Sequence, residues 1–164
     1  MATYLSGINR ATASAQNAGA RILIFLKLAL MQQHPRSTFN TADLRLGCLS
    51  YSASALWYLG YSDQALKRIH EALPLAQELA HPFSLAFALH WAGGVYQHRR
   101  EGQATQKWTE AEIALATEQG FPFWLAGGTR LRGWALVEQG QLHEGITQMG
   151  KSLIAVPPAI PGRP

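Results

Sequence analysis

Cysteine and charged residues are both scarce in this chain. Its only cysteine is Cys48, which excludes an intrachain disulfide and any zinc site built on paired cysteines, and which is typical of a reducing compartment. We therefore expect a cytoplasmic protein. Charged residues make up 15% of the 164 residues, with 14 Lys and Arg against 10 Asp and Glu. The basic residues occur in isolated pairs and form no long run, so nucleic acid is not the partner that the composition favours.

Long hydrophobic runs are also lacking. A bilayer crossing needs about 20 apolar residues, whereas the longest run, Ile22 to Met31, is half that length and contains Lys27. No cleavage pattern of small residues follows it, as a secretory signal would require. We expect a buried helix there, with no membrane contact. Since 48% of the residues are hydrophobic, the chain can build one sizeable core.

The residue patterns of catalysis and metal binding are missing as well. None of the six histidines has a second histidine four residues away with an acidic neighbour, the spacing of a helical zinc site. The closest pair, His90 and His98, is two helical turns apart. Cys48 has no base that the sequence can assign to it. We expect no enzyme, no metal site and no cofactor.

One motif argues for a cofactor. Residues 145–152, GITQMGKS, fit the phosphate-binding pattern G-x-x-x-x-G-K-[ST], in which Lys151 would contact the nucleotide. That loop functions only between a buried strand and a helix N-terminus. Here a helix end and a turn precede it, and Pro157 follows soon after it. We expect residues 145–152 to lie inside a helix, which leaves nucleotide binding as the third hypothesis for function.

A repeat runs through the rest of the chain. The segment PFSLAFALHWAG begins at Pro82, and PFWLAGGTRLRG begins at Pro122, forty residues later. Stepping back forty residues from Gly93 gives Ala53, another small residue, so small and large apolar positions recur in register. A repeat of this length is the signature of a stacked architecture.

Within each unit the apolar spacing is helical. Ala65, Ile69 and Leu73 are the clearest case, at spacings of four. Glycines and prolines separate the helices, and no stretch between residues 44 and 156 alternates as a strand would. We predict an all-α chain, an α-solenoid of antiparallel helix hairpins with a period of about forty residues. Its repeat domain spans residues 21–156, with a half unit at 22–33 and hairpins at 43–80, 82–119 and 122–156.

These positions resemble a tetratricopeptide repeat. Ala53, Gly60 and Ala65 match the family's small residue, turn glycine and second small residue, and Gly133, Gly140 and Gly145 match them again in the last unit. The longer unit, with phrases such as ATEQGFPFWLAGGTRLRGWALVEQG, is similar to the repeat region of large bacterial signalling proteins. Those proteins join a nucleotide cyclase or kinase domain to a STAND-type or AAA-like ATPase domain and a helical repeat array. The resemblance transfers no catalytic residue.

The resemblance implies a non-catalytic module that binds a protein or peptide segment, or that relays a signal between the domains of a parent regulator. The alternative is a solenoid that binds RNA or a small effector, since the net charge is +4. In stacked hairpins the first helices line a concave face, and equivalent positions form rows across it. The candidate binding residues on these rows are Ser50, Trp57, Tyr58, His90, Gln97, His98, Arg130 and Trp134.

The two ends do not match the repeat. Residues 1–20 are rich in Ala, Ser and Asn, and residues 157–164 contain four prolines, so we expect both segments to be poorly ordered. No polar capping helix follows the last hairpin. We therefore expect that the chain is a fragment of a longer array, or that it self-associates through its C-terminal hairpin.

Overall fold

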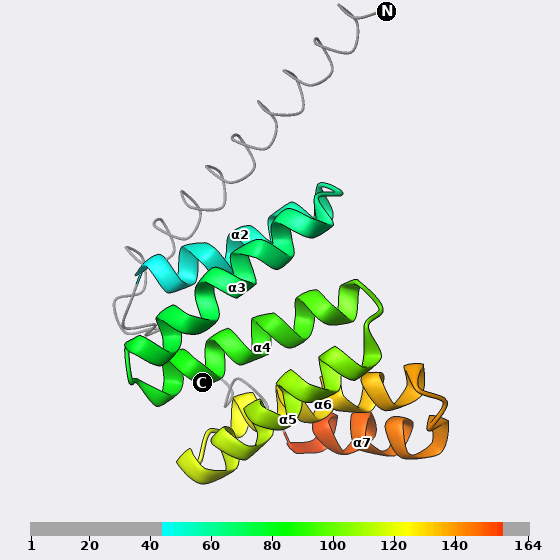
Figure 1. The fold of residues 1–164 in the computed structure, drawn as a ribbon. Helices are drawn as coiled ribbons and strands as arrows, with labels where there is room; N and C mark the ends of the chain where they lie inside the picture. The colour runs from blue at the N-terminus through cyan, green and yellow to red at the C-terminus, as the bar shows by residue number, and fades with distance from the viewer. Residues whose placement is uncertain (1–43, 156–164) are drawn as a thin grey trace, which may run out of the picture.

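The computed structural model describes residues 44–155, which form six α-helices and no strand (Figure 1). The predicted all-α class is therefore confirmed for this part of the chain. The half unit at 22–33 and both ends, 1–20 and 157–164, lie outside the described residues. The helices are α2 (Leu44–Tyr58), α3 (Ser62–Glu78), α4 (Pro82–His98), α5 (Gly102–Gln119), α6 (Pro122–Glu138) and α7 (Leu142–Ala155).

Prolines and glycines set the helix boundaries as the sequence predicts. Pro82 and Pro122 occupy the first turns of α4 and α6, where a missing N–H group costs nothing. Gly120 ends α5 in the left-handed conformation, with φ of 67°. Ser62, whose side chain is typical of a helix cap, is instead the first residue of α3, and its hydroxyl accepts a hydrogen bond from Arg99 of the next hairpin.

The helices pack in chain order. Each helix contacts the one that follows it, and α4 contacts both α2 and α6, so the first helices of the three pairs lie side by side (Figure 1). Apolar side chains from α2 to α6 form one core, in which Leu46, Ile69 and Phe87 are fully enclosed. Burying side chains of this size stabilises the fold by about 1.5–3 kcal/mol each.

Small residues at one repeated position let the helices of a pair approach closely. Ala53, Gly93 and Gly133 are spaced by forty residues and all three are buried. A Cβ added at Gly93 would lie 2.8 Å from Cγ2 of Thr109 on α5, and one added at Gly133 would lie 2.7 Å from the carbonyl oxygen of Gly145 on α7. In the second and third hairpins, the repeated small position therefore marks a close approach of the two helices.

Within residues 44–155, no helix is long and apolar enough to cross a membrane.

Candidate functional site

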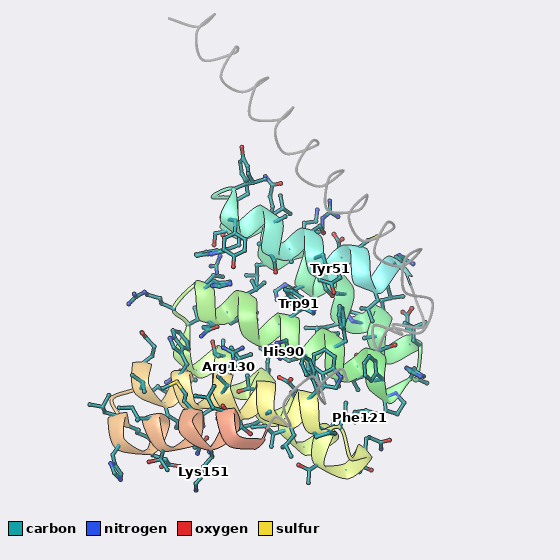
Figure 2. All side chains as sticks on the ribbon, turned by 180° about the vertical axis from the view of Figure 1, so that it is seen from behind. Tyr51, His90, Trp91, Phe121, Arg130 and Lys151 are labelled. Carbon is teal, nitrogen blue, oxygen red and sulfur yellow. The ribbon has the colours of Figure 1, made fainter. Side chains whose placement is uncertain are left out.

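An aromatic layer joins the first helices of the three pairs. The ring centroids of Tyr51 on α2 and Trp91 on α4 lie 5.0 Å apart, and those of Phe87 on α4 and Trp124 on α6 lie 5.9 Å apart, both in edge-to-face geometry. Such pairs add about 0.5–1.5 kcal/mol beyond the area they bury. Figure 2 shows Tyr51, Trp91, His90 and Arg130 following one another from α2 across α4 to α6. This layer fixes the positions of the polar side chains beside it.

A hydrogen-bonded pair, His90 and Glu112, lies beside this layer. Nδ1 of His90 on α4 is 2.9 Å from Oε1 of Glu112 on α5, and the Glu112 side chain is fully enclosed while His90 is partly exposed. Its second oxygen, Oε2, has no hydrogen-bond partner among the described residues. An enclosed carboxylate is rare unless it is paired, because leaving water costs several kcal/mol. His90 is therefore its only direct partner here.

Two glycines of α6 close the space around this pair. A Cβ added at Gly127 would lie 2.9 Å from Cε1 of His90, and one added at Gly128 would lie 3.1 Å from Cδ of Glu112. The indole of Trp124, one turn earlier on α6, lies 5.3 Å from the His90 ring, and its buried Nε1 has no partner among the described residues. Three helices, α4, α5 and α6, thus meet at one polar centre.

The surroundings of Glu112 favour its neutral form. Burial raises the pKa of its carboxyl group, while the hydrogen bond from His90, the charge of His90 and the charge of Arg130 act in the opposite direction. Desolvation is the largest of these causes, so the net shift is upward. The protonation of the Glu112 carboxyl group is therefore sensitive to the charge placed near it.

Arg130 on α6 is the exposed cation whose charge acts on the Glu112 carboxyl group. Arg68, Arg99, Arg100 and Arg132 each form an ion pair with a carboxylate. Arg130 forms no hydrogen bond or ion pair with the part of the chain that the structure describes, and its side chain is exposed on α6. It remains available to an anionic group from outside.

The other predicted binding residues fall into two groups. Trp57 stacks on His98, with ring centroids 5.6 Å apart and planes 6° apart, so this pair joins α2 to α4. Burial lowers the pKa of His98. Tyr58, beside them, is 75% exposed, with its ring 5.6 Å from that of His98. Trp57 and His98 therefore support the face, and Tyr58 extends from it.

Ser50, Gln97 and Trp134 differ in their accessibility. Ser50 is fully buried, and its hydroxyl donates to the carbonyl oxygen of Leu46, so it is satisfied within α2 and offers nothing to a partner. Gln97 and Trp134 are partly exposed. Ser50 is thus the one buried candidate, and the exposed or partly exposed candidates are Trp57, Tyr58, His90, Gln97, His98, Arg130 and Trp134.

The phosphate-loop motif lies wholly inside α7, as we expected from its register. Its backbone is helical from Gly145 to Ser152. Gly145 packs against Gly133, and the Ser152 hydroxyl donates to the carbonyl oxygen of Met149. Lys151 is exposed. A helical backbone directs these N–H groups along the helix axis, so they form no phosphate cradle.

Glu112 and its neighbours Gly127 and Gly128 were missed by the sequence argument. A signal for Glu112 was present, because the residues forty positions before and after it are Ala72 and Ser152, and both are buried. A glutamate in a row of small buried residues requires a partner. The register alone does not identify that partner as His90, since the two residues are on different helices.

No family model matches this chain, and neither the curated proteins nor the solved structures contain a match to it.

Proposed function

We propose that residues 44–155 form a non-catalytic, tetratricopeptide-like solenoid whose inner face binds a segment of another protein or of another domain. The first helices α2, α4 and α6 make this face. The observation that carries the proposal is the exposed and unpaired Arg130 beside a rigid aromatic layer. Aromatic and arginine side chains are the residues that most often dominate protein interfaces.

The order of helix contacts supports the solenoid part of this proposal. Consecutive pairs pack in chain order, first helices lie beside first helices, and small residues recur every forty positions at the tightest contacts. Stacks of this kind expose equivalent positions as rows. His90 and Arg130 occupy one such row, and Trp134 lies one turn beyond Arg130 on the same helix.

The chemistry of the face defines a ligand. A guanidinium group binds a carboxylate through charge-assisted hydrogen bonds. Trp134, one turn beyond Arg130, and Tyr58 at the end of α2 supply apolar surface on the same face. The expected ligand is an extended peptide with an acidic side chain or terminal carboxylate, flanked by apolar residues. In the wider context we propose a cytoplasmic regulator of bacterial type, in which this module recruits a partner or relays a signal between domains.

A small effector is the second candidate, and a different surface favours it. A groove of about 430 Å³ lies between α5, α6 and α7, lined by Glu110, Ile113, Ala114, Thr129, Arg132 and Gln148. The Arg132 Nε–H donates to Oε1 of Glu110 over 3.1 Å in this groove. RNA has less support, because Arg99, Arg100 and Arg132 already pair with carboxylates.

The test is a selection from a random peptide library followed by affinity measurements on variants. Arg130→Ala should weaken the selected peptides about 10- to 100-fold, the equivalent of a lost charged hydrogen bond. Arg68→Ala is the matched control, since Arg68 is an exposed arginine on α3 that pairs with Glu71. Equal affinities for both variants would refute the proposed face. A steep loss of binding between low and physiological salt, with no peptide sequence preference, would favour a nucleic acid instead.

A further inference from the structure

The outer side of α7 carries an apolar stripe that nothing in residues 44–155 covers. Leu142 is 58% exposed, Ile146 is 55% exposed and Leu153 is 75% exposed. Gly150 lies between the last two, and a Cβ added to it would meet no atom within 4 Å. Isolated exposed apolar residues are ordinary, whereas three in line on one helix face mark a contact surface.

The equivalent face is covered in both earlier hairpins. Forty residues before Leu153 is Ile113 on α5, whose Cγ1 would lie 3.0 Å from a Cβ added at Gly128 of α6. Forty residues further back is Leu73 on α3, which is buried. Gln106, the equivalent of Ile146, receives a hydrogen bond from Gln139 of α6. In register, the α7 stripe is the surface on which a following first helix packs.

Gly150 supports the same conclusion independently. A glycine inside a helix costs roughly 0.5–1 kcal/mol relative to alanine. Gly133 and Gly145 offset that cost by letting α6 and α7 pack backbone to backbone. Gly150 has no such contact within the described residues, although it lies in the middle of the stripe. A helix from outside the hairpin could pack closely against Gly150, as α6 and α7 pack at Gly133 and Gly145.

We propose that α2 of a second copy of this chain packs on the α7 stripe, in the register that α4 keeps on α3 and α6 keeps on α5. Gly128 on α6 receives the side chain of Ile113, and Ala88 is the small buried residue of α4 at the same repeat position. Their equivalent on α2 is Cys48, which would receive Leu153. By the same offset Gly150 faces Ser52, and Ile146 faces Leu59.

The two surfaces suit each other chemically. Cys48 and Ser52 are partly exposed, and Leu59 is 44% exposed. Arg45 is the only charged residue of α2, and the stripe on α7 has none, so no charge is buried by their contact. Because α2 and α7 are different surfaces, the contact is heterologous and adds copies in one direction. A single helix pair buries little area, so association is weak and depends on concentration.

The single native cysteine provides the test. In Leu153→Cys, the new thiol would lie against Cys48 of a neighbouring copy, as Ile113 lies against Gly128, so oxidation should join the two sulfur atoms in a disulfide. Mild oxidation of this variant at high concentration should give a ladder of dimers, trimers and longer species on a non-reducing gel. The double variant Leu153→Cys, Cys48→Ser should give none. Leu153 is exposed and Cys48 is partly exposed, so both substitutions should preserve the fold. Circular dichroism checks this for each variant.

Lys151→Cys is the matched control, because Lys151 is exposed on α7 but lies outside the stripe. Its crosslinking should fall well below that of Leu153→Cys. Crosslinked dimers that persist in the double variant would mean that α7 pairs with α7, and the proposal would be wrong. Monomers alone in Leu153→Cys, or a ladder of equal strength in Lys151→Cys, would also overturn it.

Discussion

Substituting alanine for Gly133 tests the closest helix contact in the molecule. A Cβ at this position would lie 2.7 Å from the carbonyl oxygen of Gly145, 2.8 Å from Cγ of Met149 and 3.1 Å from its backbone nitrogen. Two of these atoms belong to the α7 backbone, so a change of side-chain rotamer cannot relieve the overlap. The two helices must move apart, and the packing around them loosens.

The expected size of the effect follows from two opposing terms. Overpacking of this kind costs about 1–3 kcal/mol, and the higher helix propensity of alanine returns about 1 kcal/mol. Gly133→Ala should therefore lower the free energy of unfolding by about 1 kcal/mol on balance. Gly94→Ala is the control, because a Cβ there would meet no atom within 4 Å, and it should raise the free energy by roughly 0.5–1 kcal/mol.

Urea unfolding followed by circular dichroism measures both variants. Their free energies of unfolding should change in opposite directions and differ by about 2 kcal/mol. Since 1 kcal/mol moves Tm by about 2–4 °C in a chain of 150–250 residues, thermal melts should separate the two variants. If Gly133→Ala is as stable as Gly94→Ala, then α6 and α7 do not approach each other so closely at Gly133. The small residue at this repeat position would then need another explanation.

Three further changes give distinct results. The native state holds the Glu112 proton more tightly than the unfolded chain, so the contribution of Glu112 to stability should be lost as pH rises above about 4.3, the ordinary pKa of glutamate. In urea titrations across that range, the stability of Glu112→Gln relative to wild type should therefore increase with pH, and a constant difference would contradict the raised pKa. Phe87→Ala should cost about 3–5 kcal/mol, because Phe87 is enclosed by two tryptophans and a tyrosine; a cost below about 1 kcal/mol, measured by the same unfolding assay, would argue against the aromatic layer. Lys151→Ala should change the free energy of unfolding by less than about 0.5 kcal/mol, and its melting temperature in ATP should equal that of wild type. If ATP raises the melting temperature of wild type and not that of Lys151→Ala, the phosphate-loop hypothesis would be supported.

The fold was predictable where the sequence repeats. Pro82 and Pro122 open equivalent helices, and Gly120 and Gly140 close the helices before their turns, so local chemistry marks each boundary. Ser62 shows the limit of that reasoning. It has the side chain of a helix cap, but its hydroxyl accepts a hydrogen bond from Arg99 across the interface between two hairpins. A local sequence pattern does not reveal tertiary contacts of that kind.

The candidate site was predictable as a face and not as a set of contacts. Register placed His90 and Arg130 in one row, yet it also placed Ser50 there, and the structure buries Ser50 against its own helix. Glu112 lies on a second helix, which an argument confined to first helices could not reach. Its pairing with His90 depends on the space left by Gly127, and that space exists only after three helices have packed.

The linear order of helix contacts has a mechanical consequence. Within residues 44–155, α7 contacts only α6, and no helix contacts another more than two places away. Tension applied between the two ends would therefore meet one interface at a time, and helices would detach in turn from an end of the stack. The centre around α4, which contacts α2, α3, α5 and α6, would open last.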